Sequence, residues 1–167
     1  TITILEQYDK DGHIPVFGFG ARLPPFYNVG SSCFAMNGNI FNPDTYRAKG
    51  ILDRIRRRYP LSCNMGHQHM RRVLSMWLHD ITEIAITGRK FYNILVIITR
   101  GKLSDPEKVL EQVVRATDFP LSIIIVGVGK ENKANFEAMD VLDGEEDEDG
   151  MIKLVDKNGN RAKRDIV

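Results

Sequence analysis

His67 and His69 are the residues whose type and spacing come nearest to a metal site. Imidazole nitrogens bind zinc, and Cys63 is close enough in the sequence to add a thiolate. No acidic residue lies within a few positions to complete a set of four ligands. A polar loop that leads into a helix at Met70 is the favoured alternative.

Two glycine pairs follow candidate strands, at Gly18-Phe19-Gly20 and Gly127-Val128-Gly129. A dinucleotide-binding loop would need another glycine three positions further on, where Leu23 and Asn132 stand instead. Neither segment contains the phosphate-loop pattern either. Glycines that permit sharp turns at strand ends are therefore the favoured interpretation.

No serine, cysteine or carboxylate pair stands in a recognisable catalytic setting. Sequence spacing also offers no Ser-His-Asp arrangement. The sequence therefore predicts a protein that is not an enzyme and has no catalytic residues.

The stretch Arg47–Arg72 contains eight basic residues and one acid, Asp53. One interpretation is a solvated helix face whose last turn carries cations, which suits the helix dipole. The other is a surface for an anionic partner, either phospholipid headgroups or an acidic protein. The candidates for such a surface are Arg54, Arg56, Arg57, Arg58, Arg71 and Arg72.

The run Asp143–Asp149 carries six acidic residues. It lacks the alternating ligand positions of an EF-hand calcium loop. A solvated loop is the favoured interpretation.

Composition sets outer limits on the function. The chain has 167 residues, of which 43% are hydrophobic and 27% charged, as expected for one globular domain rather than a disordered chain. Its net charge of +1 gives no overall electrostatic reason to bind nucleic acid. Apolar runs are far shorter than the roughly 20 residues that span a bilayer. Two cysteines and no visible signal peptide indicate a reducing, cytoplasmic compartment.

Three apolar runs are predicted to be strands, at Ile14–Phe19, Phe91–Thr99 and Leu121–Val128. The last two are rich in Ile and Val and apolar on both alternating faces, as parallel strands covered by helices require. Asn158-Gly159 is a strong signal for a tight turn and predicts a hairpin or an edge strand near the carboxyl terminus.

Helical patterns separate these strands. One runs from Pro43 to just before Pro60, and another begins at Met70 with a stripe of apolar residues and stops near Gly88. A third begins at Ser104, where a capping residue precedes a proline and a glutamate. Alternation of helices and strands predicts an α/β layer fold with a mainly parallel sheet.

Several ordered segments resemble the copine family. The segment Phe17–Pro25 reads FGFGARLPP and is similar to the family's GFGA(K/R)LPP segment. Met36–Asn39 resembles its LNGN segment, Ile97–Gly101 its IITDG strand end, and Pro120–Gly129 its PLSIIIVGVG strand. Three shorter matches follow in order, at Phe136–Met139, Leu142–Gly144 and Arg164–Val167. The resemblance covers residues 1–167.

This resemblance implies a von Willebrand A-like domain with a Rossmann-like, doubly wound sheet. It also implies calcium-dependent phospholipid binding in membrane-associated signalling or trafficking, with recruitment from the cytoplasm to the plasma membrane. Two C2 domains upstream would bind the lipid, while this domain would bind other proteins and no nucleic acid. Candidate partner-binding residues at the carboxyl edge of the sheet are Asn37, Asn39, Asn64, His67, Arg100 and Lys102.

A-type domains of this kind often hold magnesium or manganese, and the resemblance implies a degenerate form of that metal site here. The position of a ligating Asp is occupied by Arg100, and Asn64–His67, where a ligating Thr is expected, contains no Thr. A cation in place of a carboxylate repels a divalent metal. We therefore expect no Mg or Mn in this chain, and calcium only through C2 domains outside it.

Three other hypotheses about the function remain open. Similar domains in plants are joined to a RING and act as ubiquitin ligases, although two cysteines cannot supply a RING within this chain. The chain would instead bind anionic lipid directly if Arg47–Arg72 forms a membrane-facing surface. A metal-dependent adhesion domain is disfavoured by Arg100.

The resemblance also implies that the first strand of the fold is missing from this chain. That strand would lie in the middle of the sheet, so its loss leaves two rows of backbone groups without partners. We therefore expect these 167 residues alone to be poorly stable. Thermal unfolding followed by circular dichroism checks this, and a cooperative transition at high temperature would contradict it.

Overall fold

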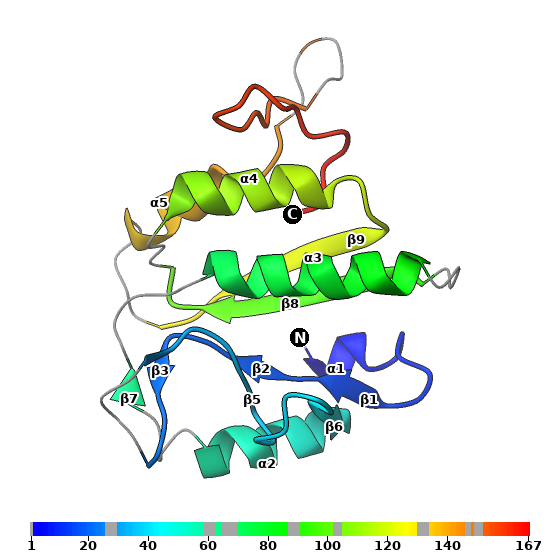
Figure 1. Ribbon diagram of the computed structural model, residues 1–167, viewed down its shortest axis with the longest axis vertical. Coiled ribbons are helices and arrows are strands. Elements are labelled where there is room, and N and C mark those ends of the chain that lie inside the picture. Colours follow the sequence, from blue (N-terminus) through cyan, green and yellow to red (C-terminus); the bar gives the residue numbers. More distant parts are fainter. Residues whose placement is uncertain are drawn as a thin grey trace. The chain divides into compact units, whose positions relative to one another are not determined.

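The computed structural model describes residues 2–25, 30–58, 63–64, 70–86, 91–101, 105–129, 134–145, 148 and 152–167. The chain divides into two compact units, Thr1–Gln68 and His69–Val167. Each unit has strands and helices of its own (Figure 1).

Short antiparallel strands dominate the first unit. β1 pairs with β6, β2 pairs with β5, and β3 lies between β4 and β7. Its elements, in chain order, are α1 (Ile2–Leu5), β1 (His13–Pro15), β2 (Phe17–Gly18), β3 (Ala21–Arg22), β4 (Gly30–Ser31), β5 (Phe34–Ala35), β6 (Asp44–Tyr46), α2 (Arg47–Arg58) and β7 (Cys63–Asn64).

The strand predicted over residues 14–19 is divided at Val16. Its two parts pair antiparallel with different strands, and Val16 itself bonds to both neighbouring segments: its N–H donates to the Pro43 carbonyl (3.3 Å) and its carbonyl accepts from the Met36 N–H (2.9 Å). All strand pairs among the described residues of this unit are antiparallel. Of the mainly parallel sheet expected from the sequence, the described residues show one parallel pair, which lies in the second unit.

Helix α2 begins later than the predicted start at Pro43. The intervening residues are extended because Asp44–Tyr46 pairs with His13–Pro15. Arg47 then takes a left-handed backbone conformation (φ 53°) that joins strand to helix. Of the predicted apolar stripe, Ile51 is buried, whereas Leu52 is 50% exposed and Ile55 is 37% exposed.

In both Gly-x-Gly segments the first and second glycines have different structural roles. The first glycine of each admits an aromatic ring, since a Cβ at Gly18 would overlap Phe34 and one at Gly127 would overlap Phe136. The second glycine, Gly20 or Gly129, has a positive φ (67° and 107°), which only glycine adopts readily. The predicted role of these glycines in turns is confirmed for the second glycine of each pair. The structure also shows that the first glycine makes room for an aromatic ring, which the sequence did not predict.

A parallel strand pair organises the second unit. β8 (Asn93–Thr99) and β9 (Leu121–Gly127) run in register from Asn93 opposite Leu121 to Thr99 opposite Gly127, which confirms both predicted strands. The described residues of this unit include the helices α3 (Met70–Ile86), α4 (Pro106–Ala116) and α5 (Ala134–Asp140). Figure 1 shows α3 and α4 running alongside the two strands.

Burial alternates along β8, because successive side chains of a strand point to opposite faces. Leu95, Ile97 and Thr99 are buried, whereas Ile94 and Ile98 are 43% and 44% exposed. The sequence predicted burial on both faces. The structure fully buries only one.

The predicted helix from Met70 is confirmed in α3. Met70, Val73, Leu74, Leu78 and Ile81 are buried, as the periodic stripe requires. The predicted stop at Gly88 lies outside the described residues.

The third predicted helix is α4, where Asp105 rather than Ser104 stands at the amino-terminal cap. Asp105 makes no side-chain capping bond, and Ser104 lies outside the described residues. Val109, Val113 and Val114 are buried as predicted, and Gln112 receives a hydrogen bond from Ser75 of α3 (3.2 Å).

The carboxyl-terminal segment is fastened to the connection between α4 and β9. The Arg164 guanidinium donates to the carbonyls of Phe119 and Leu121, and the Ile123 N–H donates to the Ile166 carbonyl (2.6 Å). The Lys163 N–H donates to the Thr117 hydroxyl (3.1 Å). Backbone and side-chain bonds together therefore fix the last residues against β9.

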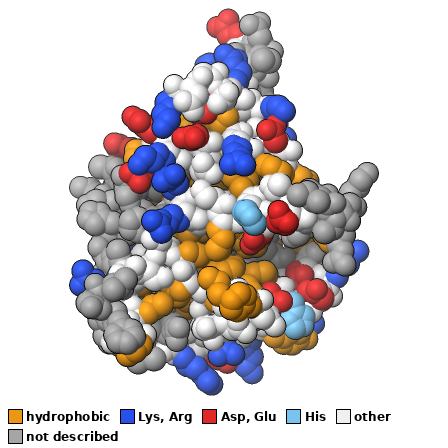
Figure 2. All heavy atoms as spheres, viewed as in Figure 1, with side chains coloured by type: hydrophobic (Ala, Val, Ile, Leu, Met, Phe, Trp, Pro, Cys, Tyr) orange, Lys and Arg blue, Asp and Glu red, His pale blue; other side chains and the backbone are white. Residues whose placement is uncertain are grey.

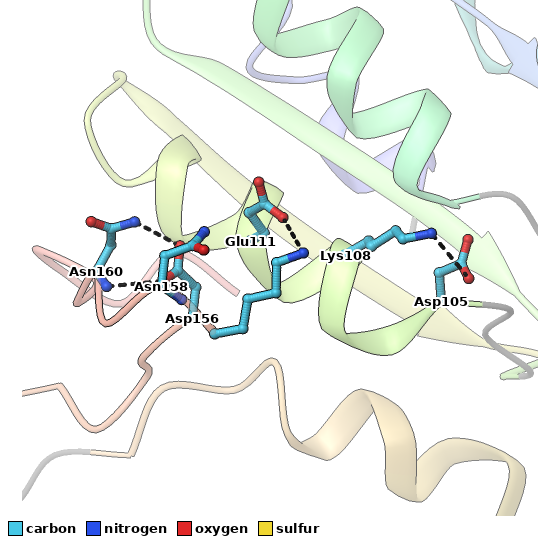
Figure 3. A network of polar contacts seen from close by, with 7 residues as sticks. Asp105, Lys108, Glu111, Asp156, Asn158 and Asn160 are labelled. Atoms are coloured by element: carbon cyan, nitrogen blue, oxygen red, sulfur yellow. Dashed lines mark hydrogen bonds and ion pairs between the residues drawn. The ribbon is translucent and has the colours of Figure 1, made fainter.

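The predicted tight turn is confirmed between Val155 and Arg161, which form an antiparallel bridge. Asp156 accepts hydrogen bonds from the Asn158 N–H (2.8 Å), the Asn160 N–H (2.9 Å) and the Asn160 side-chain amide (2.9 Å). Figure 3 shows these side chains. Lys157 of the same turn forms an ion pair with Glu111 of α4 (3.5 Å).

These amide bonds, above all the one from the Asn160 side chain, lower the pKa of Asp156 below its ordinary value. Because the carboxylate form is favoured, the turn is fully stabilised above the ordinary Asp pKa and loses that stabilisation as the pH falls through the lowered pKa. We expect the Asn158 and Asn160 amide signals to titrate together at acid pH in NMR spectra. The same titration in Asp156→Asn would contradict this assignment, while Asp165→Asn, in the same segment, is the matched control that should leave it intact.

Candidate functional site

Asn37 and Asn39 hold the loop between β5 and β6 in shape. The Asn37 side-chain amide donates to the carbonyls of Asn42 (2.6 Å) and Asp44 (3.2 Å), while its oxygen accepts from the Asn39 N–H (2.8 Å). The Asn39 side-chain oxygen accepts from the Phe41 N–H (3.1 Å). Both predicted partner-binding residues therefore bond within their own loop.

This loop also presents two apolar side chains to solvent. Ile40 is 53% exposed and Phe41 is 96% exposed. Sequence reasoning missed them, although an apolar pair between Asn-Gly-Asn and Asn-Pro, both typical of turns, was a usable signal. Such a pair has no neighbouring strand or helix to bury it.

Arg100 is exposed directly after β8. Thr99, the residue before it, is buried; its hydroxyl accepts from the Gly101 N–H (3.2 Å) and its carbonyl accepts from the Val128 N–H of the neighbouring strand end (2.8 Å). These bonds fix the backbone on both sides of Arg100. The position therefore offers a guanidinium, and no oxygen ligand, at the carboxyl end of the parallel pair, so this residue does not fit a divalent metal.

The six predicted partner-binding residues are divided between the two units. Asn37, Asn39 and Asn64 belong to the first, and Arg100 belongs to the second. Asn64 lies in β7, and its side chain is outside the description; His67 and Lys102 lie outside the described residues altogether. The structure thus describes the Asn37–Asn39 loop within the first unit and the Arg100 strand end within the second.

The predicted anionic-surface residues are divided in the same way. Arg54, Arg56 and Arg57 are exposed along α2, and Figure 2 shows Lys and Arg side chains gathered over that helix at the lower edge of the view. Arg58 ends the helix, and its side chain is not described. Arg71 and Arg72 are exposed in the first turn of α3, in the second unit.

Arg47, the first residue of α2, is held in place by several contacts. Its N–H donates to the Gly12 carbonyl (2.9 Å), and its guanidinium lies 5.2 Å from the centre of the Tyr46 ring and 3.4 Å from Glu6. The hydrogen bond with Tyr46 is the main reason that the pKa of Arg47 is raised. This arginine therefore anchors the start of the helix to the segments before it, although its side chain is itself exposed.

Two features are absent from the described residues. No group of three or more His, Cys, Asp or Glu lies close enough there to hold a metal ion, and the pair His67 and His69 falls outside this part of the chain. No described helix is long and apolar enough to cross a bilayer.

Comparison with known proteins gives one consistent result. The family model described as Copine matches residues 1–167. Copine-C of Dictyostelium discoideum is 34% identical over 165 residues, which is 99% of this chain and 29% of that relative. The chain therefore spans less than a third of the length of this relative.

The amide bonds of Asn37 are expected to govern the rigidity of the Ile40–Phe41 loop. Asn37→Ala removes three hydrogen bonds, each with a net worth of about 0.5–1.5 kcal/mol. We expect faster hydrogen exchange across residues 38–43, measured by mass spectrometry. Asn42→Ala is the control, because Asn42 takes part through its backbone; equal exchange in the two variants would refute the role of the Asn37 side chain.

Proposed function

The chain belongs to the copine family, and on that premise we propose that it is a non-enzymatic protein-interaction module of a calcium-dependent phospholipid-binding protein. The full-length protein would act in membrane-associated signalling or trafficking. The observation that carries this proposal is the match of the family model to the whole chain, residues 1–167.

The proposal assigns lipid binding and protein binding to different domains of the full-length protein. The chain spans 29% of the relative that it matches, which leaves room for further domains in a protein of that length. We propose that C2 domains outside this chain bind calcium and phospholipid and bring the protein from the cytoplasm to the plasma membrane. The present domain then meets its protein partners at that surface.

The complete fold that we propose is a doubly wound, mainly parallel sheet of the von Willebrand A type. The parallel pair of β8 and β9, joined through α4, supports it. The exposure of Ile94 and Ile98 also supports it, since an aliphatic strand face in a doubly wound sheet is normally covered.

We propose that the metal site of A-type domains is degenerate here and that Mg or Mn is not a cofactor. The support is the guanidinium of Arg100 on a strand end whose backbone is fixed by Thr99. At 4 Å, a unit charge repels another of the same sign by about 4 kcal/mol at an effective dielectric constant of 20. The same charge would attract an acidic group of a partner protein.

Partner capture by the full-length protein tests this role. Arg100→Glu reverses an exposed charge, so we expect it to lose a discrete set of proteins that the unaltered protein retains, as measured by affinity capture and mass spectrometry. Calcium-dependent sedimentation with phosphatidylserine vesicles should be unchanged, because the proposed lipid sites lie elsewhere.

Arg115→Glu is the matched control, since Arg115 is an exposed arginine in the last turn of α4. The same captured set in all three proteins would overturn Arg100 as a partner-binding residue. Failure of the unaltered protein to sediment with vesicles in calcium would overturn the phospholipid-binding part of the proposal.

A further inference from the structure

We propose that the first unit contacts an anionic lipid bilayer directly, with Ile40 and Phe41 as an apolar anchor and the basic face of α2 as its electrostatic partner. This inference goes beyond the protein-interaction role and does not rest on it. It also differs from calcium-dependent lipid binding, because the loop tip has no carboxylate and α2 has a single one, Asp53, among its basic residues.

The anchor is an exposed apolar tip on a loop of defined shape. Phe41 is 96% exposed and Ile40 is 53% exposed. The Asn39 side chain holds the Phe41 N–H, and the Asn37 side chain closes the base of the loop by bonding to Asn42 and Asp44. Because the loop is already ordered, little conformational entropy remains to be lost when the tip binds.

The electrostatic partner is the solvent-facing side of α2. Lys49, Leu52 and Arg56 follow one another at spacings of three and four residues, which places them on one side of the helix. Leu52 is 50% exposed, and both cations are exposed. Asp53 shares this side of the helix, four residues after Lys49 and three before Arg56, so the two cations exceed the acid by one charge.

Loop and helix belong to one continuous structure. The Asn37 amide bonds to the carbonyl of Asp44, the first residue of β6, and α2 begins immediately after Tyr46, the last residue of that strand. β6 is in turn paired with β1. Figure 1 shows the loop leading through β6 into α2 within the first unit. The apolar tip and the basic helix are therefore held on a shared framework.

A bilayer fits these features better than an acidic protein does. A protein partner would need a pocket matched to a single protruding phenylalanine and a separate set of carboxylates matched to the helix. A fluid anionic bilayer accepts an apolar side chain at any point and attracts lysine and arginine without fixed geometry. Charge complementarity therefore selects phosphatidylserine-type headgroups as the ligand.

Sedimentation of the full-length protein with vesicles tests the anchor. The vesicles contain equal parts of phosphatidylcholine and phosphatidylserine, and a calcium chelator is present so that any calcium-dependent lipid site is silent. Because burial of a phenylalanine is worth about 1.5–3 kcal/mol, Phe41→Ser should weaken binding about tenfold or more. Phe91→Ser is the matched control, since Phe91 is also exposed (57%) but lies in the second unit.

A second pair of variants tests the contribution of the basic face of α2. The double variant Lys49→Glu/Arg56→Glu should abolish binding, whereas Arg115→Glu/Lys153→Glu, which changes the net charge equally at exposed positions of the second unit, should not. Binding of the unaltered protein should fall with added salt and vanish on vesicles of phosphatidylcholine alone.

Insertion of the tip is measured separately with Phe41→Trp. Quenching of the added emission by lipids with brominated tails would support insertion. The proposal is overturned if the unaltered protein fails to bind without calcium, or if Phe41→Ser binds as the unaltered protein does. It is also overturned if Phe41→Ser retains vesicle binding and loses only captured proteins, because the tip would then serve a protein partner. The Arg100→Glu result is independent of all these outcomes.

Discussion

The parallel hydrogen-bonded ladder between β8 and β9 is the interaction on which the second unit depends. Parallel strands cannot be joined by a tight turn, so the chain that leaves Thr99 must cross through α4 before it returns at Leu121. That crossover brings the buried valines of α4 into the core. The carboxyl-terminal segment then binds to the end of the crossover, where the Arg164 guanidinium donates to the carbonyls of Phe119 and Leu121.

Aromatic rings packed on glycine backbone recur in both units. Phe34 lies against Gly18 and Phe136 lies against Gly127, and in each case the second glycine of the pair makes the turn. The residue type that suggests a phosphate-binding loop is used here for close packing and for chain reversal. This explains why the two segments resemble nucleotide-binding loops in composition and lack their third glycine.

In the first unit, some side chains predicted to bind a partner form hydrogen bonds within the protein instead. Other side chains, which the sequence analysis did not single out, are exposed to solvent. The Asn37 side-chain amide and the Asn39 side-chain oxygen bond to the backbone nearby, and the same loop exposes the apolar side chains of Ile40 and Phe41. Along α2, Arg47 anchors the helix through Tyr46 and Glu6, while Lys49, Leu52 and Arg56 face solvent. The surface of this unit therefore combines positive charge with exposed apolar groups, a combination suited to an amphipathic boundary.

Local patterns in the sequence determined the regular elements of the second unit. The helix from Met70, the helix after Asp105, the strands around Leu95 and Ile123 and the turn at Asn158 all follow from periodicity or turn chemistry, which depend on near neighbours in the chain. Only the tertiary structure decided the first unit. Residues 44–46 form a strand because they pair with His13–Pro15. The segment 14–19 is divided because its two parts pair with two different strands, β6 and β5. The turn residues on either side of Ile40 and Phe41 were a local signal of exposure, but the tertiary structure decided it, since whether an apolar side chain is covered depends on segments far away in the chain.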